Sequence, residues 1–190
     1  MDYSRYSDFE LITALREDTD SSNEAFNTIF FKYMSQLFGY CLFKSESREE
    51  AEELMQETWI RFYNSIKSGK STNNILALLF TISRNLSINK YKEKNRKKNL
   101  NISALSSIDY DSIADSYNFQ NEIEKDEILG ILELAVNSLD EKYKETVLLY
   151  WFGELNYRQI AEICDETEDC IRRRFERATK KLHSILVPYI

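Results

Sequence analysis

The sequence predicts an all-α fold of two small helical domains joined by a flexible acidic linker, and three features lead to this prediction. The 190 residues are 43% hydrophobic, which is enough for domains with a hydrophobic core. Only four residues are Gly and one is Pro, so the turn residues that β-hairpins and β-sandwiches require are almost absent. Apolar residues recur at helical spacing on both sides of a polar central segment.

The N-terminal part contains three signatures of a helix start. Each is a capping box, in which a Ser hydroxyl and the Glu side chain three residues later satisfy free amides at a helix N-terminus: Ser7 with Glu10, Ser21 with Glu24, and Ser47 with Glu50. After the second box the apolar positions at helical spacing are Phe26, Ile29, Phe30, Tyr33, Leu37 and Cys41. After the third box they are Ala51, Leu54, Met55, Thr58, Phe62 and Ile66. These patterns predict amphipathic helices.

A polar break at 65–74, SIKSGKSTNN, precedes a fourth predicted helix. Its apolar positions are Ile75, Leu78, Leu79, Ile82 and Leu86. The same helix continues into a segment rich in Lys and Arg. We therefore expect its first half to lie in the core and its second half to be exposed.

From Asn99 to Asn121 the helical periodicity is lost and Ser, Asn and Asp dominate, which is typical of a flexible linker. Periodicity then returns at Ile123, Ile128, Ile131, Leu132, Ala135 and Val136. Three more helices are predicted, over 140–151, over 157–164, and from a turn at 165–167 to about Val187, where Pro188 ends the last. The expected division is an N-terminal domain at 1–98, a linker at 99–121 and a C-terminal domain at 122–190.

The charges are not evenly distributed. The net charge of −7 opposes binding to a polyanion, yet two segments are strongly basic. The first basic stripe, 84–98, has seven basic residues and one acid, and the second, 170–181, has six basic residues and one acid. Acids gather instead at 46–57 and 109–127. Either stripe alone is typical of a solvated helix face, but together they indicate two cationic surfaces for one polyanion.

Several function classes find no support in the sequence. No apolar run reaches 18 residues, and the first twenty residues carry six acids, so we expect a cytoplasmic protein without direct membrane insertion. The three Cys match no disulfide framework, and Cys164, Cys170 and His183 lack the spacing of zinc ligands, so no metal is expected. No catalytic triad, Cys/His pair or phosphate-binding loop is present. We therefore predict no enzyme and no cofactor.

The segment from Tyr157 to Leu182 has the layout of a helix-turn-helix. Its first helix has the small residue Ala161 where two helices would cross closely. The second helix is expected to bury Ile171, Phe175, Ala178 and Leu182 and to expose Arg172, Arg173, Glu176 and Arg177. Arg and Glu side chains can read guanine and cytosine in a major groove, although a helical hairpin that binds no DNA would look similar.

Three segments resemble, in order and spacing, the extracytoplasmic-function sigma factors of bacterial RNA polymerase, a subfamily of the sigma-70 family. They are AEELMQETWIRFY at 51–63, LLFTISRNLSINKYKEKNRKK at 78–98, and LDEKYKETVLLYWFGELNYRQIAEICDETEDCIRRRFERATKKL at 139–182. The resemblance implies an N-terminal helical bundle of the sigma region 2 type and a C-terminal helix-turn-helix of the region 4 type. The first would grip the polymerase clamp and open the minus-ten element, and the second would read the minus-thirty-five element.

The resemblance also implies residue roles. For polymerase binding the matching residues are Glu50, Glu53, Leu54 and Gln56. For the minus-ten element they are Asn73 and Asn74, in a loop that resembles the one capturing a flipped base, with Arg84, Asn85, Asn89, Lys90 and Lys92. For the minus-thirty-five element they are Tyr157, Arg158, Arg172, Arg173, Glu176 and Arg177. One departure from the family pattern stands out, because Glu168 and Asp169 suit the positive end of a helix dipole yet would repel phosphate.

The function predicted from all this is a promoter-specificity subunit that has no catalysis of its own. Its partners would be core RNA polymerase, promoter DNA and an inhibitory anti-sigma protein. Two alternatives remain open at this point. One is a stand-alone helix-turn-helix regulator whose N-terminal domain binds an effector or dimerises, and the other is a helical adaptor that has lost DNA binding. A stand-alone regulator should bind duplex DNA tightly by itself, which a net charge of −7 disfavours.

Overall fold

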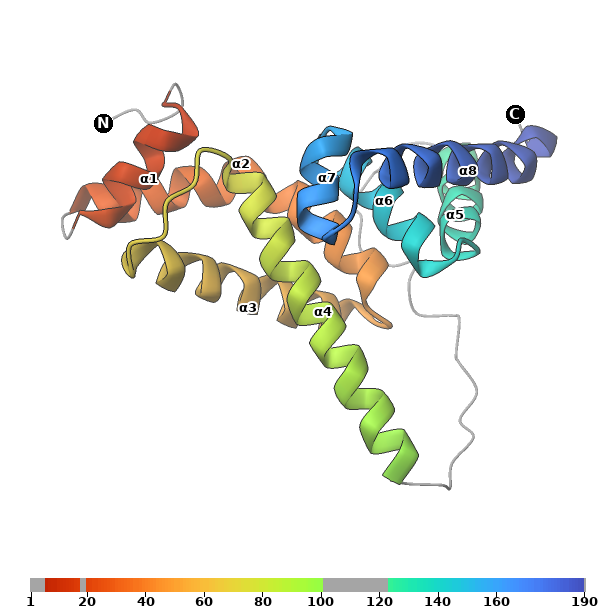
Figure 1. Cartoon of the computed structure of the whole chain (residues 1–190), viewed down its shortest axis with the longest axis horizontal. Coiled ribbons are helices and arrows are strands. Elements are labelled where there is room, and N and C mark those ends of the chain that lie inside the picture. Colours follow the sequence, from red (N-terminus) through yellow and green to blue (C-terminus); the bar gives the residue numbers. More distant parts are fainter. Residues whose placement is uncertain (1–5, 18–19, 101–122, 190) are drawn as a thin grey trace. The chain divides into compact units, whose positions relative to one another are not determined.

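The computed structural model describes residues 6–17, 20–100 and 123–189, and the regular elements in these ranges are all helical (Figure 1). The all-α prediction is therefore confirmed. The chain divides into two compact units, Met1–Tyr110 and Asp111–Ile190. Residues 101–121 of the predicted linker lie outside the described residues, and Asn99 and Leu100 are the last two residues of a helix.

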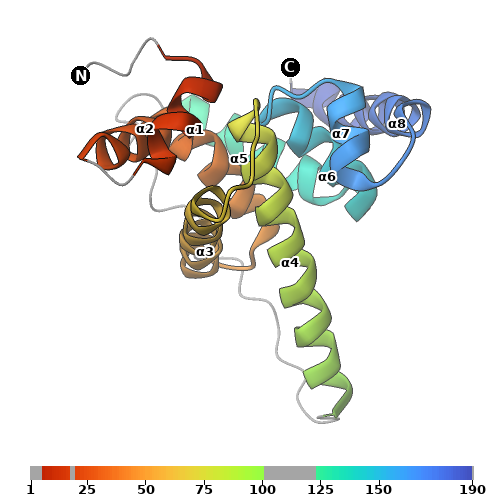
Figure 2. The ribbon, with the colours of Figure 1, turned by 60° about the vertical axis from the view of Figure 1, so that its left-hand side comes forward.

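The first unit contains the helices α1 (Asp8–Arg16), α2 (Asp20–Lys44), α3 (Arg48–Lys67) and α4 (Ile75–Leu100). Helix α1 packs on α2 and α3, α2 also packs on α3 and α4, and α3 packs on α4. Figure 2 shows that the C-terminal half of α4 runs past α3 and away from the other helices of this unit. Ile75, Leu78 and Leu79 in the apolar half of α4 are buried as expected. In the basic half Lys92 and Arg96 are exposed as expected, whereas Lys90 and Lys94 are half-buried.

The three capping boxes have three different outcomes. The Ser7 box is confirmed, because the Ser7 hydroxyl accepts the Glu10 amide and the Glu10 carboxylate accepts the Ser7 amide at 2.8 Å. Ser47 does cap α3, but the Glu50 carboxylate accepts the Glu46 amide instead. The Ser21 box is wrong, since α2 already begins at Asp20. The next residue, Ser22, is buried and donates to the Leu15 carbonyl at 2.9 Å, which ties the start of α2 to α1.

Aromatic and aliphatic side chains fill the core of the first unit. The Tyr40 and Phe80 rings meet edge to face, with centroids 4.9 Å apart, where α2 crosses α4. Trp59 is 5% exposed and contacts the rings of Phe26 and Phe30. The apolar pattern predicted from the sequence included Met55, which is only half-buried, and did not include Trp59. The difference arises because α3 packs against three helices, so its buried face is wider than a single apolar row.

Cys41 gives a direct test of this core. Its thiol lies 3.5 Å from the Ser83 hydroxyl, is fully buried, and has a pKa that burial raises to about 12. Because only the thiolate reacts, we expect iodoacetamide at pH 8 to label Cys164 and Cys170, which are half-buried, and to leave Cys41 unlabelled. Mass spectrometry of the labelled protein checks this, and labelling in denaturant is the control. Equal labelling of all three in the native protein would contradict the packing of α2 on α4.

The second unit contains α5 (Ile123–Asn137), α6 (Glu141–Trp151), α7 (Tyr157–Cys164), α8 (Glu168–Leu186) and a short 3-10 helix, η1 (Val187–Tyr189). Helix α8 packs on α5, α6 and α7, and α6 also packs on α7. The close turn after α6 requires Gly153, because a Cβ there would lie 2.4 Å from the Leu149 carbonyl oxygen. The predicted helices of this unit are confirmed to within about one residue.

Helices α7 and α8 form a helix-turn-helix. The turn depends on Asp165, which has a left-handed backbone with φ of 55°, a conformation that Asp tolerates better than most residues. The Glu166 amide then donates to the Ala161 carbonyl at 3.0 Å, and the Thr167 hydroxyl caps α8 by accepting the Cys170 amide. Ala161 and Ile171 are buried between the two helices. The predicted helix-turn-helix is therefore confirmed. No helix in the described ranges is long and apolar enough to cross a lipid bilayer.

Candidate nucleic-acid and protein interfaces

The solvent face of α3 carries most of the residues predicted to bind a protein partner. Glu53 and Gln56 are exposed and one turn apart, so they share a face, and the exposed Ile60 continues it. Glu50 is half-buried at the edge of this face. Leu54 is only 5% exposed and lies in the core, so its side chain is not part of the surface, and its predicted role as a contact residue is not supported by its position.

Two acidic residues of α3, with Glu46 just before it, contact the first basic stripe on α4. Lys90 Nζ lies 3.2 Å from Glu53 Oε2, and Lys94 Nζ lies 2.6 Å from Glu50 Oε1 and 2.9 Å from Glu46 Oε2. Burial raises the pKa of Glu50, but the hydrogen bonds from Lys94 and the Glu46 amide outweigh it, so the pKa lies below its ordinary value. Two surfaces that the sequence assigned to different partners are thus joined by ion pairs.

Helix α4 presents a second face that does not contact α3. Asn85, Asn89 and Lys92 recur at helical spacing and are exposed, while Arg84 is half-buried. Tyr91 is 66% exposed on a different side of the same helix, about 100° around it from Lys92, and its role was not predicted from the sequence. An exposed aromatic ring beside cations can stack on an unpaired base. The sequence feature that could have identified Tyr91 as a candidate is therefore an aromatic residue within a basic segment.

The two asparagines of the predicted base-capturing loop have different surroundings. Asn74 Oδ1 accepts the Ala77 amide at 2.8 Å and so caps α4. Asn73 is exposed, and within the described ranges its side chain has no hydrogen-bond partner. Asn73 is therefore available to a nucleotide, whereas Asn74 already has a structural role.

In the second unit, the structure brings together three residues predicted to contact the minus-thirty-five element. The Tyr157 ring packs on Phe175 of α8 and on Tyr150, with centroids 5.6 and 5.8 Å apart. Burial, Tyr150 and Glu176 raise the pKa of Tyr157, and the nearby Arg172 opposes them. Tyr157, Arg172 and Glu176 thus form one patch across α7 and α8. Arg158 is exposed at the start of α7, where its side chain pairs with Glu162.

The arginines of α8 divide into two groups. Arg172 and Arg173 are exposed, and each pairs with an acid one turn earlier, Glu168 at 3.0 Å and Asp169 at 2.7 Å. Arg177 is exposed and has no partner in the part of the chain that the structure describes. Together with Arg173 it lines a hollow of about 630 Å³ between the starts of α6 and α8. Arg174 is different, because its largely buried side chain pairs with Glu166 in the turn.

These ion pairs predict that Glu168 and Asp169 limit the affinity of α8 for DNA. Replacing both with their amides, Glu168→Gln with Asp169→Asn, frees two arginines and removes two charges that repel phosphate. We expect duplex DNA to bind several-fold more tightly, as measured by fluorescence anisotropy at fixed salt. Glu57→Gln, which also frees an arginine, Arg61, but lies on α3 of the other unit, is the control. Unchanged affinity of the double variant would show that its two arginines do not contact DNA.

No group of three or more His, Cys, Asp or Glu side chains that could hold a metal ion is found in the described residues. Apart from the buried Leu54, the residues predicted to bind partners lie on helix surfaces and in one loop. Their chemistry is that of binding through charge, hydrogen bonds and stacking.

Comparison with known proteins gives consistent matches over both units. The family described as Sigma-70 region 2 matches residues 29–97, and the family described as Sigma-70, region 4 matches residues 129–182. The chain is 29% identical to the ECF RNA polymerase sigma factor SigM of Bacillus subtilis, over 83% of this chain and 92% of SigM. It is 27% identical to the ECF RNA polymerase sigma-E factor of Haemophilus influenzae, over 87% of this chain and 89% of that protein.

Two solved structures have a similar fold. One is the sigma factor RpoE of Bartonella quintana in complex with the anti-sigma factor NepR, with a TM-score of 0.65, 22% identity, and coverage of 85% of this chain and 96% of RpoE. The other is CnrH in complex with the cytosolic domain of CnrY, with a TM-score of 0.66, 14% identity, and coverage of 95% of this chain and 97% of CnrH.

Proposed function

Because this chain belongs to the extracytoplasmic-function subfamily of the sigma-70 family of RNA polymerase sigma factors, we propose that it directs core RNA polymerase to specific promoters and helps to open the minus-ten element. The observation that carries the proposal is the placement of one cationic helix surface on each unit, on α4 and on α8. Two linked surfaces of this kind can engage two separated segments of one DNA molecule.

In the first unit, we assign polymerase binding to the exposed face of α3. Glu50, Glu53 and Gln56 offer acidic and polar groups that suit a basic partner surface and would repel DNA. The minus-ten element would meet Asn85, Asn89 and Lys92 on the exposed face of α4, with Tyr91 available for stacking and Asn73 for a flipped base.

In the second unit, α8 would lie in the major groove at the minus-thirty-five element. Its exposed N-terminal half carries Arg172, Arg173, Glu176 and Arg177, where groove-inserted helices contact base edges. Tyr157 and Arg158, at the start of α7, would position the unit on the phosphate backbone. This work needs binding energy alone, so we propose that the protein catalyses no reaction and acts in the cytoplasm beside polymerase.

An inhibitory anti-sigma protein is part of the proposal. The similar RpoE was solved with an anti-sigma factor and CnrH with the cytosolic domain of CnrY, which supports a protein partner of this kind. A partner that fixes the two units in an unproductive arrangement would silence the protein without covering every basic residue.

The test is a gel shift at fixed moderate salt with promoter DNA. We expect weak binding by the isolated protein, because its net charge of −7 opposes DNA, and a sequence-specific complex after core RNA polymerase is added. Run-off transcription from the same DNA should then depend on this protein. Tight, specific binding by the protein alone, with no effect of polymerase, would contradict the proposal and favour a stand-alone regulator.

A further inference from the structure

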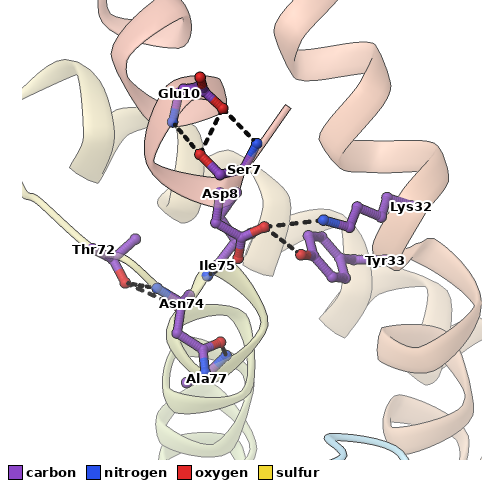
Figure 3. A network of polar contacts seen from close by, with 9 residues as sticks. All are labelled: Ser7, Asp8, Glu10, Lys32, Tyr33, Thr72, Asn74, Ile75 and Ala77. Carbon is purple, nitrogen blue, oxygen red and sulfur yellow. Dashed lines mark hydrogen bonds and ion pairs between the residues drawn. The ribbon is translucent and has the colours of Figure 1, made fainter. Parts of the chain in front are cut away.

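The loop between α3 and α4 is held by α1, which is far from it in the sequence. Asp8, the first residue of α1, accepts the Ile75 amide at the start of α4, with Oδ2 2.8 Å from that nitrogen (Figure 3). Its other oxygen, Oδ1, accepts the Tyr33 hydroxyl at 2.5 Å and Lys32 Nζ at 3.1 Å. Burial and the hydrogen bond to Asp8 raise the pKa of Tyr33 to about 12, so the Tyr33 hydroxyl keeps the proton that it donates.

The opposite end of α1 holds the beginning of the same loop. Arg16 Nη2 donates to the carbonyl oxygens of Gly69 and Lys70, at 3.1 and 2.7 Å. Lys67, the last residue of α3, donates from Nζ to the Glu17 carbonyl at 2.9 Å. Both ends of the loop are therefore fixed to α1, one by Asp8 and the other by Arg16.

Inside the loop, the two neighbours of Asn73, Thr72 and Asn74, are also held by hydrogen bonds. The Thr72 hydroxyl donates to the Asn74 carbonyl at 2.9 Å and accepts the Asn74 amide at 3.1 Å, and Asn74 caps α4 (Figure 3). Asn73 lies between these two residues and exposes its side chain. The fixed backbone thus presents the side-chain amide of Asn73, which can both donate and accept hydrogen bonds.

We propose that Asp8 and Arg16 are positioning residues that fix the loop at 68–74 so that Asn73 can select one unpaired base. This inference rests on the proposed function, because it takes the selected base to be part of the opened minus-ten element. Neither residue contacts the DNA. They act by removing the conformational freedom that the loop would otherwise lose on binding, and a preorganised group discriminates better than a mobile one.

The experiment measures base preference in the complete complex. The wild-type protein and its variants are assembled with core RNA polymerase and bound to forked DNA of a promoter selected from a random library by the wild-type complex. Each unpaired minus-ten position carries each of the four bases in turn, and the ratio of the best to the worst Kd is determined. The variants are Asp8→Asn, Arg16→Gln and Asn73→Ala. The matched control is Glu10→Gln, which weakens the cap of α1 but does not touch the loop.

The wild type should show a preference at one position that Asn73→Ala reduces roughly two- to tenfold, the value of one hydrogen bond to a base. Asp8→Asn and Arg16→Gln should reduce the preference at that same position and leave the other positions unchanged, while Glu10→Gln changes nothing. Arg16 is exposed, so its variant keeps the fold and tests the idea even where Asp8→Asn lowers the melting temperature.

Two outcomes would overturn the inference. If the wild type and Asn73→Ala differ as expected but Asp8→Asn and Arg16→Gln keep the full preference, or lose affinity equally at all positions, then α1 only stabilises the fold and the proposed function stands. If the wild type has no base preference at any unpaired position, the role proposed for the loop fails together with the inference.

Discussion

Arg173→Ala is expected to change which minus-thirty-five sequences are used. The Arg173 side chain is 70% exposed on the second turn of α8, and within the described residues its one ion pair is with Asp169. A bidentate contact from Arg to guanine contributes about 1–3 kcal/mol of discrimination, so its loss should relax the preference at one base pair by roughly 5- to 150-fold. Transcription from a randomised promoter library, followed by sequencing of the transcribed promoters, measures this change.

Lys180→Ala is the matched control for Arg173. Lys180 is exposed on the same helix, two turns further along, where contact with the phosphate backbone is expected. Its loss should lower transcription evenly and leave the preferred sequence unchanged. If both variants selected the same sequences as the wild type, the assignment of Arg173 to a base edge would be wrong.

The double change Glu53→Lys with Gln56→Ala should cause the largest loss of polymerase binding. Both side chains are exposed, and the Glu53 carboxylate, 72% exposed, has one surface ion pair with Lys90. Placing a cation on a surface that meets a basic partner should weaken the complex roughly tenfold or more, because like charges at an interface cost several kcal/mol. Co-purification with core polymerase reports the loss, and an unchanged circular dichroism spectrum shows that the helices persist.

Glu52→Lys is the control for charge reversal on α3. It makes the same change one residue earlier, at a carboxylate that pairs with Arg48 one turn back along the helix. Polymerase binding should be nearly unaffected by it. If the variant with both Glu53→Lys and Gln56→Ala still co-purified with core polymerase as well as the wild type, this acidic face would be only a solvated surface.

The helices could be predicted from the sequence because their signals are local. The Ser7 box, the apolar rows of α2 and α3, and the turn before α8 each depend on residues within a few positions of one another. The Ser21 box failed for the opposite reason, since the start of α2 is set by the contact of Ser22 with Leu15 of α1. Capping patterns carry no information about such tertiary contacts.

The candidate site was predictable only in part. The sequence identified the residues of α8, where helical spacing alone separates exposed arginines from the buried Ile171. It could not show that Lys94 of α4 meets Glu50 of α3, because these residues are distant in the chain and only packing brings them together. The same holds for the bond from Asp8 to the Ile75 amide and for the capping role of Asn74.

The ion pairs between α3 and α4 have a consequence for ionic strength. The salt dependence of DNA binding reflects the number of counterions that cationic side chains displace from the phosphates. Lys90 and Lys94 are already neutralised by Glu53, Glu46 and Glu50, and contact with a phosphate would exchange one anionic partner for another. The carboxylates left behind would then collect cations from the solution, which offsets part of the release from the DNA. The affinity of the first unit for DNA should therefore fall less steeply with added salt than the seven basic residues of its stripe would suggest.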